Sequence, residues 1–259
     1  MDKIQLSVAM ITKNEGENLA ACLNSIDFAD QIVIIDSDST DDTRQIAARF
    51  GCELFVEPWK GFGPQKQMAV DRCKNPWVLI LDADERIPQE TADVIKKIIA
   101  SSENDVAGYS FPRKNFFQGR WIRHAGWWPD RIVRLFKKDR GRVTTDPVHE
   151  SIHVDGAVKA LNVPIEHYTE SRLSKILIKI DHYSTLGAEE AFKKGKKTSI
   201  GSPVCRAGIT FFQDYFLRLG ILDGSQGLTL AMTDSINKFF KYAKLYELHR
   251  RQQNRDGKP

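Results

Sequence analysis

The first hundred residues alternate short apolar runs with segments in which apolar residues recur at every third or fourth position. Continuous apolar runs are typical of strands buried on both faces, and the recurring positions are typical of helices packed against them. The pattern predicts strands at residues 6–11, 32–35, 54–56 and 77–81. Helices are predicted between these strands, and a further one after Pro88. This alternation predicts an α/β domain with an open, mostly parallel sheet and right-handed crossovers.

The pattern changes after about residue 105. Residues 109–111 predict one more strand, and residues 113–153 are crowded with aromatic, basic and turn residues. We expect this segment to form long functional loops over the sheet. Helical spacing returns from residue 171, and it predicts helices over residues 173–183, 187–197, 211–219 and 228–251, with a turn at residues 220–227.

Carboxylates follow two of the predicted strands at the point where each strand ends. Asp36 and Asp38 come after the second strand, and Asp82 and Asp84 come after the fourth. Because parallel strands end at a common edge where ligand sites form, we expect a nucleotide to lie across both clusters. Side chains at positions i and i+2 of an extended segment share a face, so Asp82 and Asp84 can approach one divalent cation.

Helix capping is the alternative interpretation of these acids. Acidic residues near the start of a helix satisfy its free N–H groups and face the positive end of its dipole. We expect this role for Asp41, Asp42 and Glu85, and we place the cap of the second helix at Ser39 or Thr40. Asn14 is the expected cap of the first helix.

Composition indicates a folded, intracellular protein. The chain has 259 residues, of which 41% are hydrophobic and 28% charged, so it can form one large domain with an appendage. No window approaches the roughly 20 apolar residues of a membrane-spanning helix, and the start lacks the features of a signal peptide, so we expect a cytoplasmic location. The four cysteines are widely spaced without a Cys-x-x-Cys pair, which favours reduced, packed thiols.

Positive charge is concentrated in the last third of the chain. Residues 172–259 hold 16 Lys and Arg against 8 Asp and Glu, whereas residues 1–171 hold 22 against 26. Basic helices with aromatic residues are suited to the surface of an anionic membrane, although packing on the domain or a dimer contact would produce the same pattern. Because the chain carries no recognised nucleic-acid-binding motif, we expect no nucleic-acid partner.

Three motifs, in this order, resemble those of the family 2 glycosyltransferases. They are Ser7 to Glu15, Val33 to Asp41, and Leu79 to Glu85, which contains an Asp-x-Asp sequence. Residues 125–130, 147–150 and 222–227 are similar to the bacterial branch that extends the lipopolysaccharide inner core, often as a β-1,4-glucosyltransferase. The Gln-x-x-Arg-Trp motif of processive synthases is absent from the sequence, which favours transfer of a single sugar.

The resemblance implies a GT-A fold, Rossmann-like, with a mostly parallel sheet flanked by helices and a C-terminal helical extension. It implies a donor-binding half at residues 1–110, an acceptor-binding and catalytic half at residues 111–170, and a basic amphipathic helical region at residues 171–259. The implied activity is metal-dependent inverting transfer of glucose from UDP to a glycolipid acceptor. Galactose, an N-acetylhexosamine and a heptose remain open as donor sugars. Mg²⁺ or Mn²⁺ is the expected cofactor, and the cytoplasmic face of the inner membrane is a possible location.

The resemblance and the positions of the polar residues together assign candidate roles. We expect donor binding by Thr12, Asn14, Glu15, Asp36, Asp38, Lys66, Asp82 and Ala83. We expect the metal at Asp84, Asp82 and His153, with His149 and His167 as alternative histidines. We expect the acceptor at Trp127, Trp128 and Arg131. A carboxylate must take the proton of the acceptor hydroxyl, and we expect Glu150 in that role, with Asp130 as the alternative.

A second enzyme class shares part of the pattern. Residues 34–40 also match the signature of the haloacid dehalogenase family, in which the first Asp, here Asp36, is phosphorylated and Asp38 assists. That family carries the signature on its first strand, whereas here a complete strand and helix precede it. The order of elements therefore favours the glycosyltransferase, and a phosphatase is the alternative hypothesis.

Overall fold

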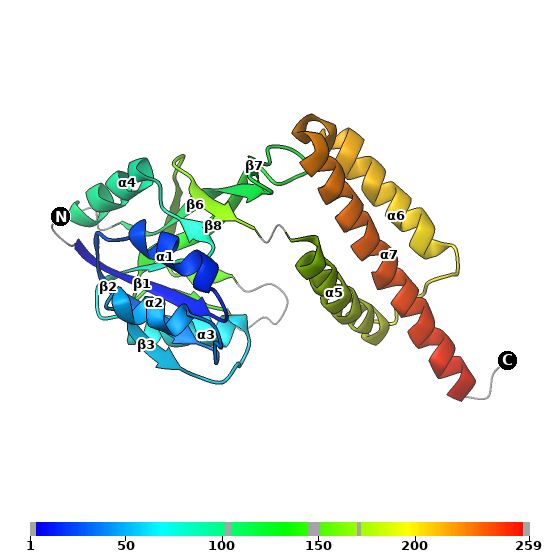
Figure 1. Cartoon of the computed structure of the whole chain (residues 1–259), viewed down its shortest axis with the longest axis horizontal. Helices are drawn as coiled ribbons and strands as arrows, with labels where there is room; N and C mark the ends of the chain where they lie inside the picture. The colour runs from blue at the N-terminus through cyan, green and yellow to red at the C-terminus, as the bar shows by residue number, and fades with distance from the viewer. Residues whose placement is uncertain (1–3, 102–104, 145–150, 170–171, 256–259) are drawn as a thin grey trace. The chain divides into compact units, whose positions relative to one another are not determined.

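A computed structural model describes residues 4–101, 105–144, 151–169 and 172–255, and it divides the chain into two compact units (Figure 1). The α/β unit comprises residues 1–114 and 130–168, and the helical unit comprises residues 115–129 and 169–259. The sequence placed residues 115–129 within a segment from 111 to 170, whereas the structure groups them with the C-terminal helices. The functional division of the chain into three parts stays a prediction.

The first half of the sheet is parallel, as the apolar runs predicted. Its strands lie in the order β3-β2-β1-β4, with bounds β1 (Ile4–Thr12), β2 (Ala29–Asp36), β3 (Glu53–Val56) and β4 (Trp77–Ile80). Thr12 pairs with Asp36 across β1 and β2, and Ala9 pairs with Ile80 across β1 and β4. The carboxyl ends of β2 and β4 therefore flank the end of β1 on one edge.

The second half of the sheet includes β6 (Val106–Phe117), which contains the strand predicted at residues 109–111, and strands that the sequence did not predict. Next to β4 come β8 (Asp130–Lys137), β6, β12 (Ile165–Tyr168) and β5 (Glu85–Arg86). The pairs β4–β8, β6–β8 and β5–β12 are antiparallel. The prediction of long loops over residues 113–153 was therefore wrong for the strands β6 and β8. Charged residues interrupt their apolar runs, and pairing of β8 with β4 and of β6 with β8 supplies the order that local composition obscured.

Short strands complete the sheets. They are β7 (Arg120–Trp121) and β11 (Ala157–Ala160), which pair with β6, and β9 (Gly141–Val143) and β10 (Ile152–Val154), which form a separate two-stranded sheet. In that small sheet His153 lies opposite Arg142.

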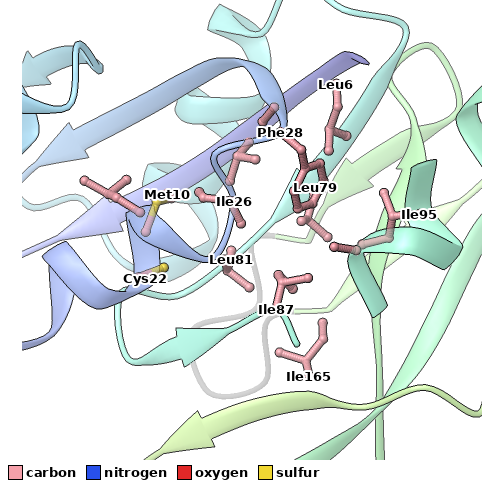
Figure 2. Packing of buried hydrophobic residues seen from close by; sticks show 14 of the residues in the cluster. Leu6, Met10, Cys22, Ile26, Phe28, Leu79, Leu81, Ile87, Ile95 and Ile165 are labelled. Atoms are coloured by element: carbon pink, nitrogen blue, oxygen red, sulfur yellow. The ribbon is translucent and has the colours of Figure 1, made fainter. Parts of the chain in front are cut away.

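Four helices cover the two faces of the parallel half. They are α1 (Gly16–Asn24), α2 (Thr43–Arg49), α3 (Phe62–Arg72) and α4 (Gln89–Ala100). Leu6 and Met10 on β1 and Leu79 on β4 pack in one core with residues of α1, α2 and α4 (Figure 2). Ala9 on β1 points to the opposite face, where it joins the core that contains residues of α3. This alternation between faces is the period-2 geometry of a strand.

The helical unit contains α5 (Leu173–Lys193), α6 (Ser202–Phe212), the π-helical turn η1 (Gln213–Leu217), the 3₁₀ turn η2 (Gly220–Asp223) and α7 (Gly224–Arg255). Helix α7 packs against both α5 and α6. The two helices predicted over residues 173–197 form one continuous helix, and the predicted turn is confined to η2. A Cβ at Gly227 would lie 1.9 Å from the carbonyl oxygen of Gly220, so this position of α7 requires glycine.

The described residues include no helix long and apolar enough to cross a membrane. Cys22 and Cys73 are buried free thiols, as predicted, and burial raises the pKa of Cys73 to about 12. Cys205 differs from the prediction because it is exposed on α6. The α/β architecture with a C-terminal helical extension is confirmed.

Candidate functional site

Asp36 joins the ends of β1 and β2. Its Oδ2 accepts hydrogen bonds from Thr12 Oγ1 at 2.8 Å and from Ser39 Oγ, and its Oδ1 accepts one from the Ser39 amide at 2.9 Å. Arg44 Nε lies 3.7 Å from Oδ1. The Asp36 side chain is 0% exposed, so its carboxylate is satisfied within the protein and holds the strand ends in register.

The loops that follow β1 and β2 are tied to each other beside Asp36. The backbone N–H of Asn14 donates to Ser39 Oγ at 2.8 Å. The side-chain oxygen Oδ1 of Asn14 accepts from the backbone N–H of Thr40, also at 2.8 Å. Asn14 and Asp38 both adopt left-handed backbone conformations, with φ of 56° and 54°. Asp38 is exposed, so it is the carboxylate of this cluster that faces solvent. The predicted cap position of Asn14 was off by one residue, because Glu15 occupies the N-cap of α1.

The helix-capping interpretation holds for Asp41. Its Oδ2 accepts from the Gly16 amide at the start of α1 at 2.9 Å, and its Oδ1 accepts from the Thr43 amide at 3.1 Å. Asp42 occupies the N-cap position of α2, which was predicted at Ser39 or Thr40, and its side chain forms no capping bond. Local hydrogen bonds to Asp36 retain Ser39 in the loop, which delays the start of α2.

At the end of β4, Asp82 lies between two cations. Its Oδ1 is 3.0 Å from Lys66 Nζ on α3, and its Oδ2 accepts a 2.6 Å hydrogen bond from Arg134 on β8. Burial alone would raise the pKa of Asp82, but Arg134 and Lys66 outweigh it and hold that pKa well below its usual range. Ala83, which follows, is buried, and its carbonyl accepts from Arg86. Lys66 therefore lies at the acid-rich edge, and its binding to the donor stays a prediction.

Arg134 is the organising residue of this edge that sequence reasoning did not find. It also donates to Glu85 Oε1 at 2.7 Å, so one guanidinium bridges two carboxylates. Glu85 is fully buried in β5, and its Oε2 accepts from the Asp82 amide at 3.1 Å. The prediction that Glu85 starts a helix was wrong, because the chain first pairs β5 with β12 and α4 begins only at Gln89.

Asp84 lies beside a histidine from a distant strand. His167 Nε2, on β12, is 3.3 Å from Asp84 Oδ2, and the Tyr168 amide donates to the Asp84 carbonyl at 2.8 Å. Both side chains keep part of their surface open, 31% for Asp84 and 18% for His167. A carboxylate oxygen and an imidazole nitrogen are donors that divalent metals accept. Among the histidines that the structure describes, it therefore favours His167 as the partner of Asp84.

The predicted metal set of Asp84, Asp82 and His153 is not brought together. Within the described parts of the chain, no group of three or more His, Cys, Asp or Glu side chains could hold a metal. His153 is exposed on the small β9–β10 sheet, and Asp82 is engaged by Lys66 and Arg134. Among the described residues, Asp84 and His167 are therefore the candidate protein donors for a divalent cation.

The catalytic candidates differ in what the structure says of them. Glu150, together with His149, lies outside the described residues. Asp130 begins β8, and its Oδ2 accepts two hydrogen bonds from Arg113, at 2.9 Å from Nε and 2.6 Å from Nη2. Arg131 donates to the carbonyl of Leu161 at 2.7 Å. Asp130 and Arg131 are thus engaged within the α/β unit.

The two candidate tryptophans belong to the helical unit. Trp127 packs against the cluster of Phe117, Ile122 and Leu230, so much of its surface stabilises this unit. Trp128 stands edge-on to Trp121 with ring centroids 5.2 Å apart, and it is partly exposed. Of the two, Trp128 is the one whose ring lies outside a core cluster of described residues.

Comparisons with known proteins agree with these motifs. The family model for glycosyl transferase family 2 matches residues 7–158. The chain is 30% identical over 255 residues to the lipopolysaccharide core biosynthesis glycosyltransferase LpsC of Rhizobium meliloti, a match that covers 95% of this chain and 94% of LpsC. It is 31% identical to an uncharacterized glycosyltransferase of Rickettsia felis, covering 95% of this chain and 90% of that protein.

Solved structures show weaker likeness. TarS of S. aureus in complex with UDP is 17% identical with a TM-score of 0.47, over 98% of this chain and 92% of that one. Glucosyl-3-phosphoglycerate synthase of Mycobacterium tuberculosis, in complex with Mn²⁺, UDP and phosphoglyceric acid, is 15% identical with a TM-score of 0.47, over 67% of this chain and 73% of that one. Both TM-scores are below 0.5, so no ligand is carried from them to this chain. The family model and the full-length match to LpsC are sufficient: the chain belongs to glycosyl transferase family 2.

Proposed function

We propose that this protein transfers one sugar, glucose, from UDP-glucose to a glycolipid acceptor of the lipopolysaccharide core, with inversion at the anomeric carbon. The observation that carries this proposal is the acid-rich edge of the parallel sheet, where β2 and β4 end on either side of β1. The similarity to LpsC over nearly the whole chain supports the acceptor class. The Asp-x-Asp sequence at the end of β4 supports a nucleoside diphosphate donor.

The donor site divides its acids between two roles. Asp36 is buried and joins the strand ends, whereas Asp82, whose side chain is 27% exposed, pairs with Lys66 and Arg134. Asp38 and Asp84 keep exposed oxygens, which suits hydrogen bonds from ribose hydroxyls and binding of a cation respectively. Thr12, Asn14 and Glu15 complete the proposed nucleoside side, and Ala83 contributes its backbone.

Asp84 and His167 fit a divalent cation, Mg²⁺ or Mn²⁺, because they offer one oxygen and one nitrogen donor with open surface. Bound there, the cation would neutralise negative charge that develops on the leaving diphosphate. Lys66 adds a positive charge to the same edge, and Asp82 orients it. We assign the removal of the acceptor proton to Glu150. The alternative base, Asp130, is paired with Arg113.

The phosphatase alternative receives no support. A nucleophilic carboxylate must reach the phosphorus of its substrate, whereas Asp36 is fully buried and accepts hydrogen bonds on both oxygens. The signature also lies on β2, which stands between β1 and β3 in the sheet. Family membership favours the transferase independently of this geometry.

The helical unit carries the proposed contact with the inner membrane. Helix α6 and the turn η1 expose large apolar side chains along their length: Val204, Ile209, Phe212, Phe216 and Leu217. This surface belongs to the part of the chain with twice as many basic as acidic residues. Apolar side chains next to basic ones suit an anionic bilayer, where a lipid-linked acceptor resides.

A thermal-shift screen tests the proposed function. UDP, GDP, CDP and ADP are each added with and without Mn²⁺, because a ligand that binds only the folded state stabilises it by about 2.7 kcal/mol at 100 times its Kd. We expect UDP with Mn²⁺ to raise the melting temperature most. Asp84→Asn should remove the part of the thermal shift that depends on Mn²⁺. The control is Asp139→Asn, which changes an exposed acid in the same way and should leave the shift unchanged. Stabilisation by none of the four diphosphates would contradict the proposal.

A further inference from the structure

A group of exposed arginines and partly exposed aromatic and histidine side chains surrounds residues 120–129 of the helical unit. Its members are Arg120, Trp121, Arg123, His124, Trp128 and Arg218, and this set is called the Arg–Trp cluster below. Five arginines lie between residues 113 and 134 of the sequence. The structure separates them, because Arg113, Arg131 and Arg134 are engaged within the α/β unit while Arg120 and Arg123 are exposed in the helical unit.

Asp223 holds the backbone of this cluster. It lies in η2 with 2% of its surface exposed, and its carboxylate accepts hydrogen bonds from the amides of Arg123 at 3.3 Å and His124 at 2.9 Å. His124 Nδ1 is 3.1 Å from the same carboxylate. A buried carboxylate with three partners is a strong constraint on the segment that carries them. This assigns a positioning role to the Asp residue of the motif at residues 222–227.

Further contacts fix the segment from the side of η1 and η2. Arg120 Nη2 donates to the carbonyl of Leu222 at 3.0 Å, and the Ala125 amide donates to the carbonyl of Arg218 at 2.8 Å. Ala125 has a φ of 54°, an unusual conformation for a residue with a Cβ. Strained backbone of this kind persists where the surroundings over-determine it, and it concentrates at ligand sites.

The charges of the cluster are arranged so that the positive ones face solvent. Arg218 pairs with Asp214 at 2.9 Å, but Asp214 is buried whereas the Arg218 side chain is 59% exposed. Asp223 is buried in the same way, and its oxygens are taken by the Arg123 and His124 groups. Residues 115–129 contain no Asp or Glu. An anion that approaches this surface therefore meets guanidinium groups before it meets a carboxylate.

The aromatic rings add a surface on which a sugar could lie. Arg123 stacks over Trp121, with its guanidinium carbon 4.2 Å from the ring centroid. Trp121 and Trp128 stand edge to face at 5.2 Å with an interplanar angle of 89°. Guanidinium groups bind phosphate and carboxylate in a bidentate way, and an indole ring offers an apolar face. The pairing of both features at one place is suited to a sugar that carries a negative charge.

We propose that the Arg–Trp cluster is a subsite for an acidic sugar of the acceptor, which binds through a phosphate or a carboxylate group. The assignment to the acceptor rests on the proposed function, whereas the binding of an acidic sugar can be tested without it. Arg123 makes the central contact, because its side chain is exposed and already stacked on Trp121. Asp223 acts as a positioning residue beneath it.

Ligand-observed NMR titration of the full chain with three monosaccharides tests the proposal. Mannose 6-phosphate supplies a phosphate, glucuronate supplies a carboxylate, and mannose is the neutral control. We expect at least one acidic sugar to bind at least about tenfold more tightly than mannose, and Arg123→Gln to remove about tenfold of that affinity. The matched control is Arg140→Gln, which removes an exposed arginine between β8 and β9 and should change nothing.

The outcomes separate the two sources of charge. Preference for mannose 6-phosphate assigns a phosphate, and preference for glucuronate assigns a carboxylate. Equal binding of all three sugars, or unchanged affinity in Arg123→Gln, overturns the proposal. If that variant does not fold, judged by circular dichroism, the salt dependence of the unmodified protein decides: affinity for the acidic sugar must fall between about 0.05 and 0.5 M NaCl while affinity for mannose stays constant. If UDP does not stabilise the protein in the thermal-shift screen, that result contradicts the proposed function but not the binding of an acidic sugar at the Arg–Trp cluster.

Discussion

Replacement of Arg134 by methionine is expected to destabilise the α/β unit severely. Arg134 is 6% exposed and makes hydrogen bonds of 2.6 Å to Asp82 and 2.7 Å to Glu85. Without it, Asp82 retains Lys66 at 3.0 Å, whereas the Glu85 carboxylate keeps the Asp82 amide at 3.1 Å and Arg113 at 3.9 Å as its partners among the described residues. Most of the lost folding stability is therefore expected to come from Glu85, because its carboxylate is 0% exposed and water cannot replace the missing guanidinium.

The magnitude follows from leaving a buried carboxylate without its partner, which costs about 3–5 kcal/mol. With a urea m-value of about 2 kcal/mol/M, the lower figure shifts the unfolding midpoint by about 1.5 M. The assay is urea unfolding followed by circular dichroism, with amide hydrogen exchange of β4 and β8 to identify the α/β unit. The double variant Arg134→Met with Glu85→Gln removes the buried charge, so it should recover more than half of the loss.

The pH dependence gives a second check on the same variant. Arg134 and Lys66 overcome the effect of burial and hold the pKa of Asp82 below its usual range. A lowered pKa in the folded state stabilises the protein above the unfolded value of about 3.9, and this contribution is lost as the pH falls below it. The part of the cost of Arg134→Met that comes from Asp82 should therefore stay nearly constant from pH 8 to about pH 5 and shrink as the pH falls below about 4. A cost below about 1 kcal/mol at pH 7.5, or a double variant no more stable than the single one, would refute the reasoning.

Three further predictions concern catalysis, the membrane and pH. Glu150→Gln should abolish sugar transfer while the thermal shift with UDP and Mn²⁺ persists; substantial turnover would remove Glu150 from its proposed role. Phe212→Glu should reduce sedimentation with anionic liposomes, whereas Gln213→Glu, which adds the same charge on the neighbouring exposed residue, should reduce it far less. Burial and Asp214 raise the pKa of Asp234 to about 6, so the folded state favours its protonated form and loses stability as the pH rises from about 4 to 6. Asp234→Asn should therefore raise the melting temperature at pH 7.5 but not at pH 4, and an equal shift at both values would contradict this.

Local sequence patterns were sufficient to predict the strands of the parallel half of the sheet. Each strand from β1 to β4 contains a short apolar run, and such a run is enough to recognise a strand that is buried on both faces, as β4 is; β3 at the end of the sheet is mostly exposed. The carboxylates that follow β2 and β4 were also visible in the sequence. Their shared edge follows from parallel pairing, since parallel strands end on the same side of a sheet.

The antiparallel half was beyond the reach of these patterns. The apolar residues of β6 and β8 are interspersed with arginines, and nothing local indicates that β8 returns to lie beside β4. The continuous helix α5 is a similar case, because Gly187 is a helix breaker by propensity but lies close to Lys241 of α7. Packing between distant segments outweighed the local preference in both places.

The strand order also decided which polar residues meet. Glu85 and Arg134 are 49 positions apart, Asp84 and His167 are 83 apart, and Asp223 and His124 are 99 apart. Spacing along the chain carries no information about such pairs, because they depend on which strands and turns become neighbours after folding. The acids of the candidate site and the family of the chain were therefore readable from the residues. The division of those acids into ones that pair with other side chains and ones that are candidate ligands was set by the fold, since burial and the choice of partner exist only once distant segments have packed together.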